Sequence, residues 1–191
     1  KTPFELNDQQ KEALLELEKF VLNPEKYNGN ITLTGYAGTG KTTIISLFDK
    51  WLKHISNKPV YSAPTHRANA VTKQNNPKAT VKTLHKILGL KPTVDLETAN
   101  EYNLRVQKDK QTMGGGLPYG TLLIIDESSM INDALYKRLN EFKEFSDLSI
   151  IYIGDPAQLA PVKNHGNLSQ VFTGTSIKQI KLTKVERTGD N

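Results

Sequence analysis

The sequence contains no cysteine, which excludes disulfide bonds and thiolate metal sites and agrees with a reducing compartment. Its four histidines, at positions 54, 66, 85 and 165, are scattered along the chain and do not form the pattern of a zinc site. No stretch approaches the roughly 20 apolar residues of a membrane span, and no basic-then-apolar leader opens the chain. These absences predict a soluble, cytoplasmic protein without a membrane partner.

The composition is that of an ordinary globular domain. With 37% hydrophobic and 24% charged residues, the 191-residue chain can bury a core and suits one domain with a small insertion. Lysine and arginine number 25 against 20 acidic residues, and this modest excess permits a polyanionic partner without demanding one. Because the chain starts at Lys1 without a methionine and stops at Asn191, soon after a motif-like segment, we expect it to be part of a longer protein.

The most informative segment is 35–42, which reads GYAGTGKT and is a complete Walker A loop. Its glycines let the backbone turn tightly, so that successive N–H groups can point at phosphate oxygens beside the N-terminus of the next helix. Lys41 is then expected to reach the β- and γ-phosphates, and the Thr42 hydroxyl to ligate Mg²⁺. The predicted nucleotide-binding residues in this region are Gly35, Ala37, Gly38, Thr39, Gly40, Lys41, Thr42 and Thr43.

The flanks of the loop fit this assignment, because a β-branched, apolar run at 31–34 precedes it and a helical pattern over 43–51 follows it. The remaining pattern alternates strands with helices, which predicts an α/β fold with a parallel sheet covered on both faces. Asn7 is a good N-cap, with Gln10 at the capping-box position of the first helix. We expect further helices over 67–73, over 83–88 and after Asn132, and further strands over 59–63, 121–125, 148–153 and 177–182.

The pattern changes between residues 90 and 119, where the chain is polar and contains three consecutive glycines, 114–116. A compact domain rarely uses some thirty residues for one structureless loop. We therefore expect a small insertion, either a hairpin or a mobile subdomain. A disordered surface loop is the alternative.

Polar residues follow the predicted strands. In a parallel sheet, ligands bind at the carboxyl ends of the strands, so these residues should converge on one crevice. Asp126 is placed to hold Mg²⁺ opposite Thr42, and Glu127 to orient the attacking water or accept its proton. The amide of Gln158 could sense the γ-phosphate, although a solvent-facing turn glutamine is the alternative. The polar segments that follow the strands are 35–42, 63–66, 126–130 and 154–158.

Seven motifs occur in this order: LNDQQ at 6–10, GYAGTGKT at 35–42, APTHRA at 63–68, TLH at 83–85, DESSM at 126–130, GDPAQLAPV at 154–162 and LTKVER at 182–187. The series resembles the first RecA-like domain of superfamily 1 DNA helicases, most closely the RecD and Dda type. The resemblance covers nearly the whole chain except 90–119. It implies a RecA-like ATP-binding domain over 1–89 and 120–191, with 90–119 matching a small subdomain whose hairpin separates the DNA strands.

The resemblance also implies individual roles. Gln10 matches the family's adenine-reading glutamine, Gln158 the glutamine that couples γ-phosphate state to domain movement, and Arg187 the arginine that contacts the γ-phosphate. The catalytic set is then Lys41, Asp126, Glu127, Gln158 and Arg187, with Thr42 and Asp126 holding the metal. The expected contacts to single-stranded DNA are Pro64, Thr65, His66, Thr83 and His85.

Several of these residues have simpler alternatives. Gln10 could satisfy only the N-terminus of its own helix, although both roles can coexist. His66 and His85 could each bond to neighbouring backbone. Arg187 could be an ordinary salt-bridge partner at a strand edge.

The function implied by the resemblance is that of a motor. ATP binding would close two RecA-like domains and hydrolysis would open them, moving the protein 5′→3′ along single-stranded DNA and unwinding duplex. We expect ATP and Mg²⁺ as cofactors, single-stranded DNA and a second RecA-like domain of the same parent chain as partners, and a monomer. The 191 residues alone are not expected to unwind DNA. The alternatives are a P-loop module that uses nucleotide as a switch or loader without nucleic acid, and a degenerate structural domain.

Overall fold

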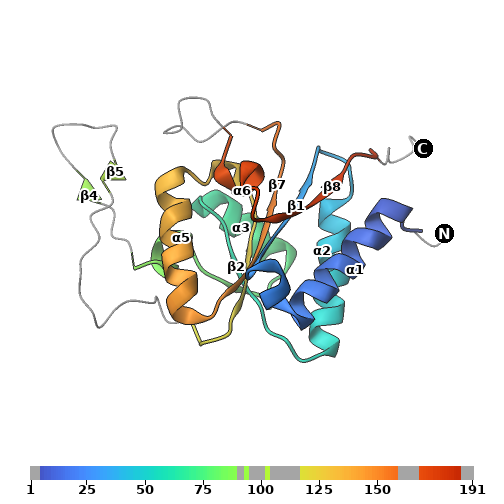
Figure 1. The fold of residues 1–191 in the computed structure, drawn as a ribbon, viewed down its shortest axis with the longest axis horizontal. Coiled ribbons are helices and arrows are strands. Elements are labelled where there is room, and N and C mark those ends of the chain that lie inside the picture. The colour runs from blue at the N-terminus through green and yellow to red at the C-terminus, as the bar shows by residue number, and fades with distance from the viewer. Residues whose placement is uncertain (1–4, 90–92, 95–101, 104–116, 159–167, 186–191) are drawn as a thin grey trace.

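The computed structural model describes residues 5–89, 93–94, 102–103, 117–158 and 168–185. Apart from a short antiparallel pair, β4 Thr93–Val94 with β5 Tyr102–Asn103, they form one sheet between two layers of helices (Figure 1). The predictions for Arg187 and for most of 90–119 lie outside the described residues. The division of the chain into a main domain and an insertion therefore stays a prediction.

The strands of the main sheet are β1 Asn30–Gly35, β2 Val60–Ser62, β3 Thr80–Val81, β6 Leu122–Ile125, β7 Ser149–Gly154 and β8 Lys178–Leu182. They are ordered β3-β2-β6-β7-β1-β8, and every neighbouring pair is parallel. This arrangement confirms the predicted α/β fold with a parallel sheet. Because β7 lies between β1 and β6, the residue after β7 sits between the phosphate loop and Asp126 at one edge of the sheet.

The helices are α1 Asp8–Leu22, α2 Lys41–His54, α3 His66–Asn75, α4 Leu84–Ile87, α5 Asp133–Ser146 and α6 Gln170–Thr173, with 3₁₀ turns η1 Pro24–Tyr27 and η2 Ser128–Met130. Ile151 and Ile153 of β7 pack with α1 and α2, whereas Ile150 and Tyr152 pack with α4, α5 and α6. Alternate residues of one strand thus enter two cores. Figure 1 shows α1 and α2 on one face of the sheet and α5 and α6 on the other. None of the described helices is both long and apolar enough to cross a lipid bilayer.

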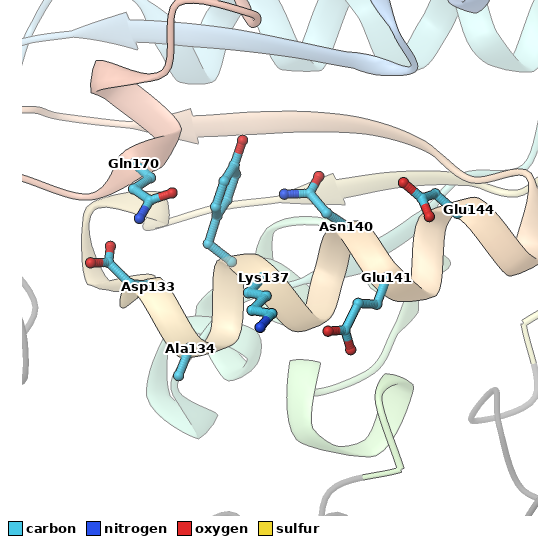
Figure 2. A pocket seen from close by; sticks show the side chains of 8 residues that line it. Asp133, Ala134, Lys137, Asn140, Glu141, Glu144 and Gln170 are labelled. Carbon is cyan, nitrogen blue, oxygen red and sulfur yellow. The ribbon is translucent and has the colours of Figure 1, made fainter.

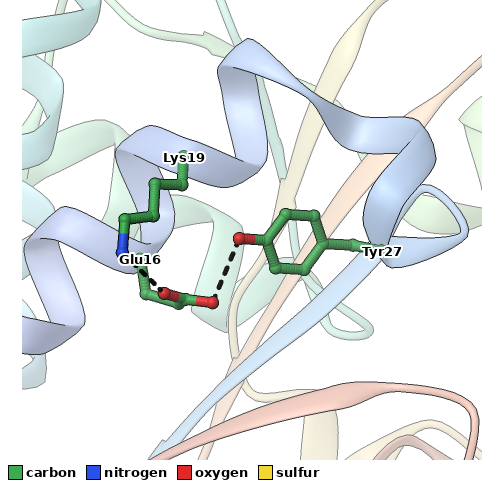
Figure 3. A network of polar contacts seen from close by, with 3 residues as sticks. All are labelled: Glu16, Lys19 and Tyr27. Atoms are coloured by element: carbon green, nitrogen blue, oxygen red, sulfur yellow. Dashed lines mark hydrogen bonds and ion pairs between the residues drawn. The ribbon is translucent and has the colours of Figure 1, made fainter.

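The predicted capping box opens α1. The Gln10 N–H donates to Asn7 Oδ1 at 2.9 Å, and the Asn7 N–H donates to Gln10 Oε1 at 3.1 Å. Beyond the end of α1, the Tyr27 hydroxyl of η1 donates to Glu16 at 3.0 Å, and Lys19 lies 3.6 Å from the same carboxylate (Figure 3). These contacts fix the chain that connects α1 to β1.

Three short elements, β3, α6 and η2, do not follow from the sequence patterns. β3 has only two residues, Thr80 and Val81, which is too few to show a period of two. α6 is a single turn of four residues. η2 starts after Glu127, whose φ of 53° is left-handed and is not marked by a glycine or asparagine. Elements of this size depend on tertiary contacts rather than on local periodicity.

Tyr152 of β7 has a buried hydroxyl without a hydrogen-bond partner among the described residues. A buried hydroxyl without a hydrogen bond lowers the stability of the folded state by roughly 1–3 kcal/mol, because it has lost its bonds to water. We therefore expect Tyr152→Phe to raise the free energy of unfolding by about 1 kcal/mol, as measured by urea denaturation. Tyr61→Phe is the control and should lower stability, because the Tyr61 hydroxyl donates to Asp49. A less stable Tyr152→Phe variant would contradict this expectation.

Candidate functional site

The chain between β1 and α2 forms a tight loop whose shape depends on glycine. Gly38 and Gly40 have φ angles of 81° and 90°, in the left-handed region that side chains disfavour. A Cβ atom at Gly40 would also lie 2.3 Å from the Gln10 amide nitrogen, and one at Gly35 would lie 2.4 Å from the Thr39 hydroxyl. Either contact would force the neighbouring side chain to move. The glycine pattern of the phosphate loop is therefore required by its geometry.

The middle of the loop is open to solvent and its end is anchored. Tyr36, Ala37 and Gly38 are exposed, whereas Thr39 is buried and its hydroxyl donates to the Tyr36 carbonyl at 2.9 Å. The amide nitrogen of the fully buried Gln10 donates to the Thr39 carbonyl at 3.3 Å. Gln10 thus caps its own helix and supports the loop at once. Its contact with adenine stays a prediction.

Lys41 is the first residue of α2 and folds back over the loop. Its ammonium group donates to the carbonyl of Gly35 and, at 3.0 Å, to that of Tyr36. Thr42 and Thr43 follow in the first turn of α2, and Thr42 is exposed. The positive end of this 14-residue helix therefore adjoins the exposed part of the loop, where an anion would be stabilised.

The two predicted carboxylates follow β6. The Asp126 N–H donates to the Ser62 carbonyl at 2.9 Å, and the Asp126 carboxylate accepts from the Glu127 N–H at 2.8 Å. Burial raises the pKa of Asp126, while the Glu127 N–H and the charge of Lys41 oppose this rise. Burial also raises the pKa of Glu127. The charge of Asp126 raises this pKa further, whereas the charge of Lys41 lowers it. Lys41 acts on both carboxylates, so all three groups lie near one another.

Asp155 lies in the same group of charges. The sequence predicts a role for Gln158 of segment 154–158 but none for Asp155. Asp155 follows β7 and is 6% exposed, and its charge adds to the rise that burial and Asp126 produce in the pKa of Glu127. Its carboxylate accepts from the Ala157 N–H at 2.9 Å, and its carbonyl accepts from the Gln158 N–H at 3.1 Å. The Gln158 residue itself is exposed. A carboxylate directly after a buried strand, as at Asp126, is the signal that could have identified Asp155.

The residues predicted to contact DNA lie at the starts of α3 and α4. Thr65 and Thr83 are helix N-caps whose hydroxyls accept from the N–H groups of Ala68 and Lys86, each at 3.2 Å. Pro64 is half-buried and His66 is exposed. Burial lowers the pKa of His85, and the charge of the nearby His66 lowers it further. The structure thus brings the two histidines together, while their contact with DNA stays a prediction.

A separate hollow of about 540 Å³ runs along α5, between Asp133 and Glu144, with Gln170 of α6 at one end (Figure 2). Its polar lining includes Lys137, Asn140 and Glu141 but none of the predicted site residues. None of the buried unpaired polar atoms found in the described residues belongs to its lining. The chemistry is therefore better sought at the phosphate loop than in this hollow.

Comparison with known proteins shows the family to which the chain belongs. The AAA domain family matches residues 5–191. The ATP-dependent DNA helicase dda of Enterobacteria phage T4 is 32% identical over 163 residues, covering 83% of this chain and 35% of the helicase. The ATP-dependent DNA helicase RRM3 of Saccharomyces cerevisiae is 30% identical over 195 residues, covering 93% of this chain and 26% of the helicase. The chain thus spans about a third or less of the length of these relatives.

Among solved structures, the Pif1 helicase from Candida albicans superposes with a TM-score of 0.61 at 24% identity, covering 96% of this chain and 41% of that one. A second Pif1 structure is described as showing DNA unwinding at forked duplex DNA by two coordinating helicases. It gives a TM-score of 0.57 at 23% identity, and the match covers 98% of this chain and 46% of that one. At these identities the two structures support the fold alone. The predicted resemblance to superfamily 1 helicases is confirmed at the level of distant homology by the sequence relatives. The chain belongs to the AAA domain family, as a P-loop NTPase domain distantly related to the Dda and RRM3 helicases.

Proposed function

We propose that the chain is the ATP-hydrolysing motor domain of a DNA helicase. The supporting observation is the convergence of the phosphate loop, Lys41, Asp126 and Glu127 at the carboxyl edge of one parallel sheet. In this proposal the domain works with a second RecA-like domain in the complete protein. Closure of the two domains around ATP then advances the protein along single-stranded DNA in the 5′→3′ direction and unwinds duplex.

The donor set at this edge fits a magnesium ion. Mg²⁺ prefers oxygen ligands and is usually held by one or two carboxylates together with substrate phosphates and water. The Thr42 hydroxyl and the half-buried Asp126 carboxylate provide such oxygens on the two sides of the site. When bound there, Mg²⁺ would neutralise charge on the phosphate oxygens. Among the described residues no group of three His, Cys, Asp or Glu side chains could hold a metal ion, so phosphate and water would complete the coordination.

The other residues of the site have separate proposed roles in ATP binding and hydrolysis. The exposed N–H groups of the loop and the start of α2 bind the phosphates, and Lys41 releases the loop carbonyls to reach the β- and γ-phosphates. Glu127 orients the attacking water or accepts its proton, a role for which a raised pKa is favourable. Gln158 and Arg187 respond to the γ-phosphate. Gln10 braces the loop and reads the adenine.

The proposed contacts with DNA follow the same edge of the sheet. Pro64, Thr65 and His66 open α3, and Thr83 and His85 open α4, so the two helix starts present N–H groups and imidazoles beside the site. Such groups suit the phosphates of a single strand. In this proposal residues 90–119 form the pin that separates the two DNA strands.

The test is the ATPase rate of the complete protein with and without single-stranded DNA, at two salt concentrations. We expect DNA to stimulate the rate at least about tenfold at low salt. The stimulation should decline as salt rises, because backbone contacts release counterions. A double-stranded DNA of the same length is the control. A rate that is indifferent to single-stranded DNA would instead favour a nucleotide-dependent switch or loader.

A further inference from the structure

Gln9, which precedes Gln10 in the first turn of α1, holds the chain that leaves β8. Its amide nitrogen donates to the Thr183 hydroxyl at 2.9 Å. Its amide oxygen accepts from the backbone N–H groups of Thr183 and Lys184, both at 3.1 Å. One side chain therefore uses its donor and its acceptor to fix two successive residues that are distant in the sequence. Residues 183–185 are called the exit segment below.

The exit segment and the end of β8 lie against the phosphate loop. Leu182 is paired in register with Gly35, and a Cβ atom at Gly35 would lie 3.1 Å from the Leu182 side chain. A Cβ atom at Gly38, in the exposed middle of the loop, would lie 3.4 Å from a methyl group of Val185. Val185 therefore lies next to the exposed middle of the loop. By sequence, the exit segment leads to Arg187.

The first turn of α1 thus contacts both the phosphate loop and the exit segment. Gln10 donates to the Thr39 carbonyl and closely approaches Gly40 at the end of the loop. Gln9 binds the exit segment, whose Val185 lies next to Gly38 in the middle of the loop. Because both glutamines belong to the same capped helical turn, this turn connects the loop and the exit segment through side-chain hydrogen bonds.

We propose that Gln9 is a positioning residue that couples nucleotide binding at the phosphate loop to the order of the exit segment. The inference rests on the proposed binding of nucleotide at this loop. Thermodynamic linkage requires the coupling to be reciprocal: if nucleotide orders the exit segment, the Gln9 contacts strengthen nucleotide binding by the same factor. If the Gln9 contacts were purely structural, nucleotide binding would not change the order of the exit segment.

The experiment measures amide hydrogen exchange of the 191-residue chain by NMR, with and without Mg·ADP. In the wild-type chain, Mg·ADP should slow exchange at the Thr183 and Lys184 amides by about threefold or more. In Gln9→Ala these amides lose their acceptor, so exchange without nucleotide should accelerate on the order of five- to tenfold. Mg·ADP should no longer slow it. The affinity for Mg·ADP should fall by the factor by which Mg·ADP slows exchange in the wild type.

Two further variants separate positioning from general disruption. Gln9→Glu keeps an acceptor for both N–H groups and can also accept from the Thr183 hydroxyl, so wild-type behaviour should return. Glu12→Ala changes an exposed residue of the same helix and should have no effect. The proposal is overturned if Gln9→Ala keeps wild-type affinity for Mg·ADP, or if Mg·ADP slows exchange equally in both chains. A wild-type chain that binds no Mg·ADP, or that binds it as well after Lys41→Ala, would instead refute the nucleotide site itself.

Discussion

Replacing Lys41 with alanine should lower the DNA-stimulated ATPase rate of the complete protein at least about a hundredfold. The Lys41 ammonium group lies over the phosphate loop, where it donates to the carbonyls of Gly35 and Tyr36. Its charge also acts on the pKa values of both Asp126 and Glu127. Without it, the loop has no lysine to neutralise the negative charge that develops on the phosphate oxygens. The measurement is phosphate release at saturating ATP and single-stranded DNA.

Lys50→Ala is the matched control, because Lys50 is an exposed lysine of the same helix. It should leave the rate within about twofold of wild type, since surface substitutions of this kind have small effects. Lys41 is not part of either hydrophobic core, so both variants should keep the thermal unfolding midpoint of the wild type. Wild-type turnover in a folded Lys41→Ala protein would show that phosphate binds elsewhere.

The features that could be predicted from the sequence are those encoded by neighbouring residues. The phosphate loop needs glycine at 38 and 40 because of their positive φ angles, and the α1 capping box is formed by Asn7 and Gln10. The parallel sheet follows from apolar runs such as 121–125, which are long enough to be buried on both faces. Each of these signals is local, so a single sequence carries it.

Contacts between distant segments could not be predicted in the same way. The order of the strands places β7 between β1 and β6, and this order brings Asp155 close to Glu127. Local periodicity carries no information about that order. The hydrogen bonds between Gln9 and the residues Thr183 and Lys184 likewise join opposite ends of the described chain. Neither residue type nor spacing distinguishes Gln9 from an ordinary helix-surface glutamine.

Several of the predicted site residues also make contacts that stabilise the fold. Thr65 and Thr83, which the sequence predicts as DNA contacts, cap α3 and α4 with their hydroxyls. Gln10 caps α1 and supports Thr39. Substitutions at these positions would therefore change helix stability together with any binding. Lys41 and Glu127, by contrast, neither cap a helix with their side chains nor belong to a hydrophobic core.

Glu127→Gln is expected to lower the turnover rate of the complete protein on the order of 10²–10⁴-fold. The glutamine amide has nearly the same size as the carboxylate but cannot accept a proton from water. It also relieves the repulsion by which Asp126 and Asp155 raise the pKa of Glu127. Affinity for ATP should therefore be unchanged or tighter, so that the defect appears in kcat rather than in binding. Rates at saturating ATP and binding of a fluorescent ATP analogue provide the two measurements.

Glu144→Gln, an exposed glutamate of α5, is the control and should keep both values. The left-handed φ of 53° at Glu127 is as accessible to glutamine as to glutamate, so a loss of rate cannot be attributed to backbone strain. A Glu127→Gln protein with full turnover would require another group to accept the proton. Asp155 would then be the first residue to test, because its buried carboxylate acts on the same position from the end of β7.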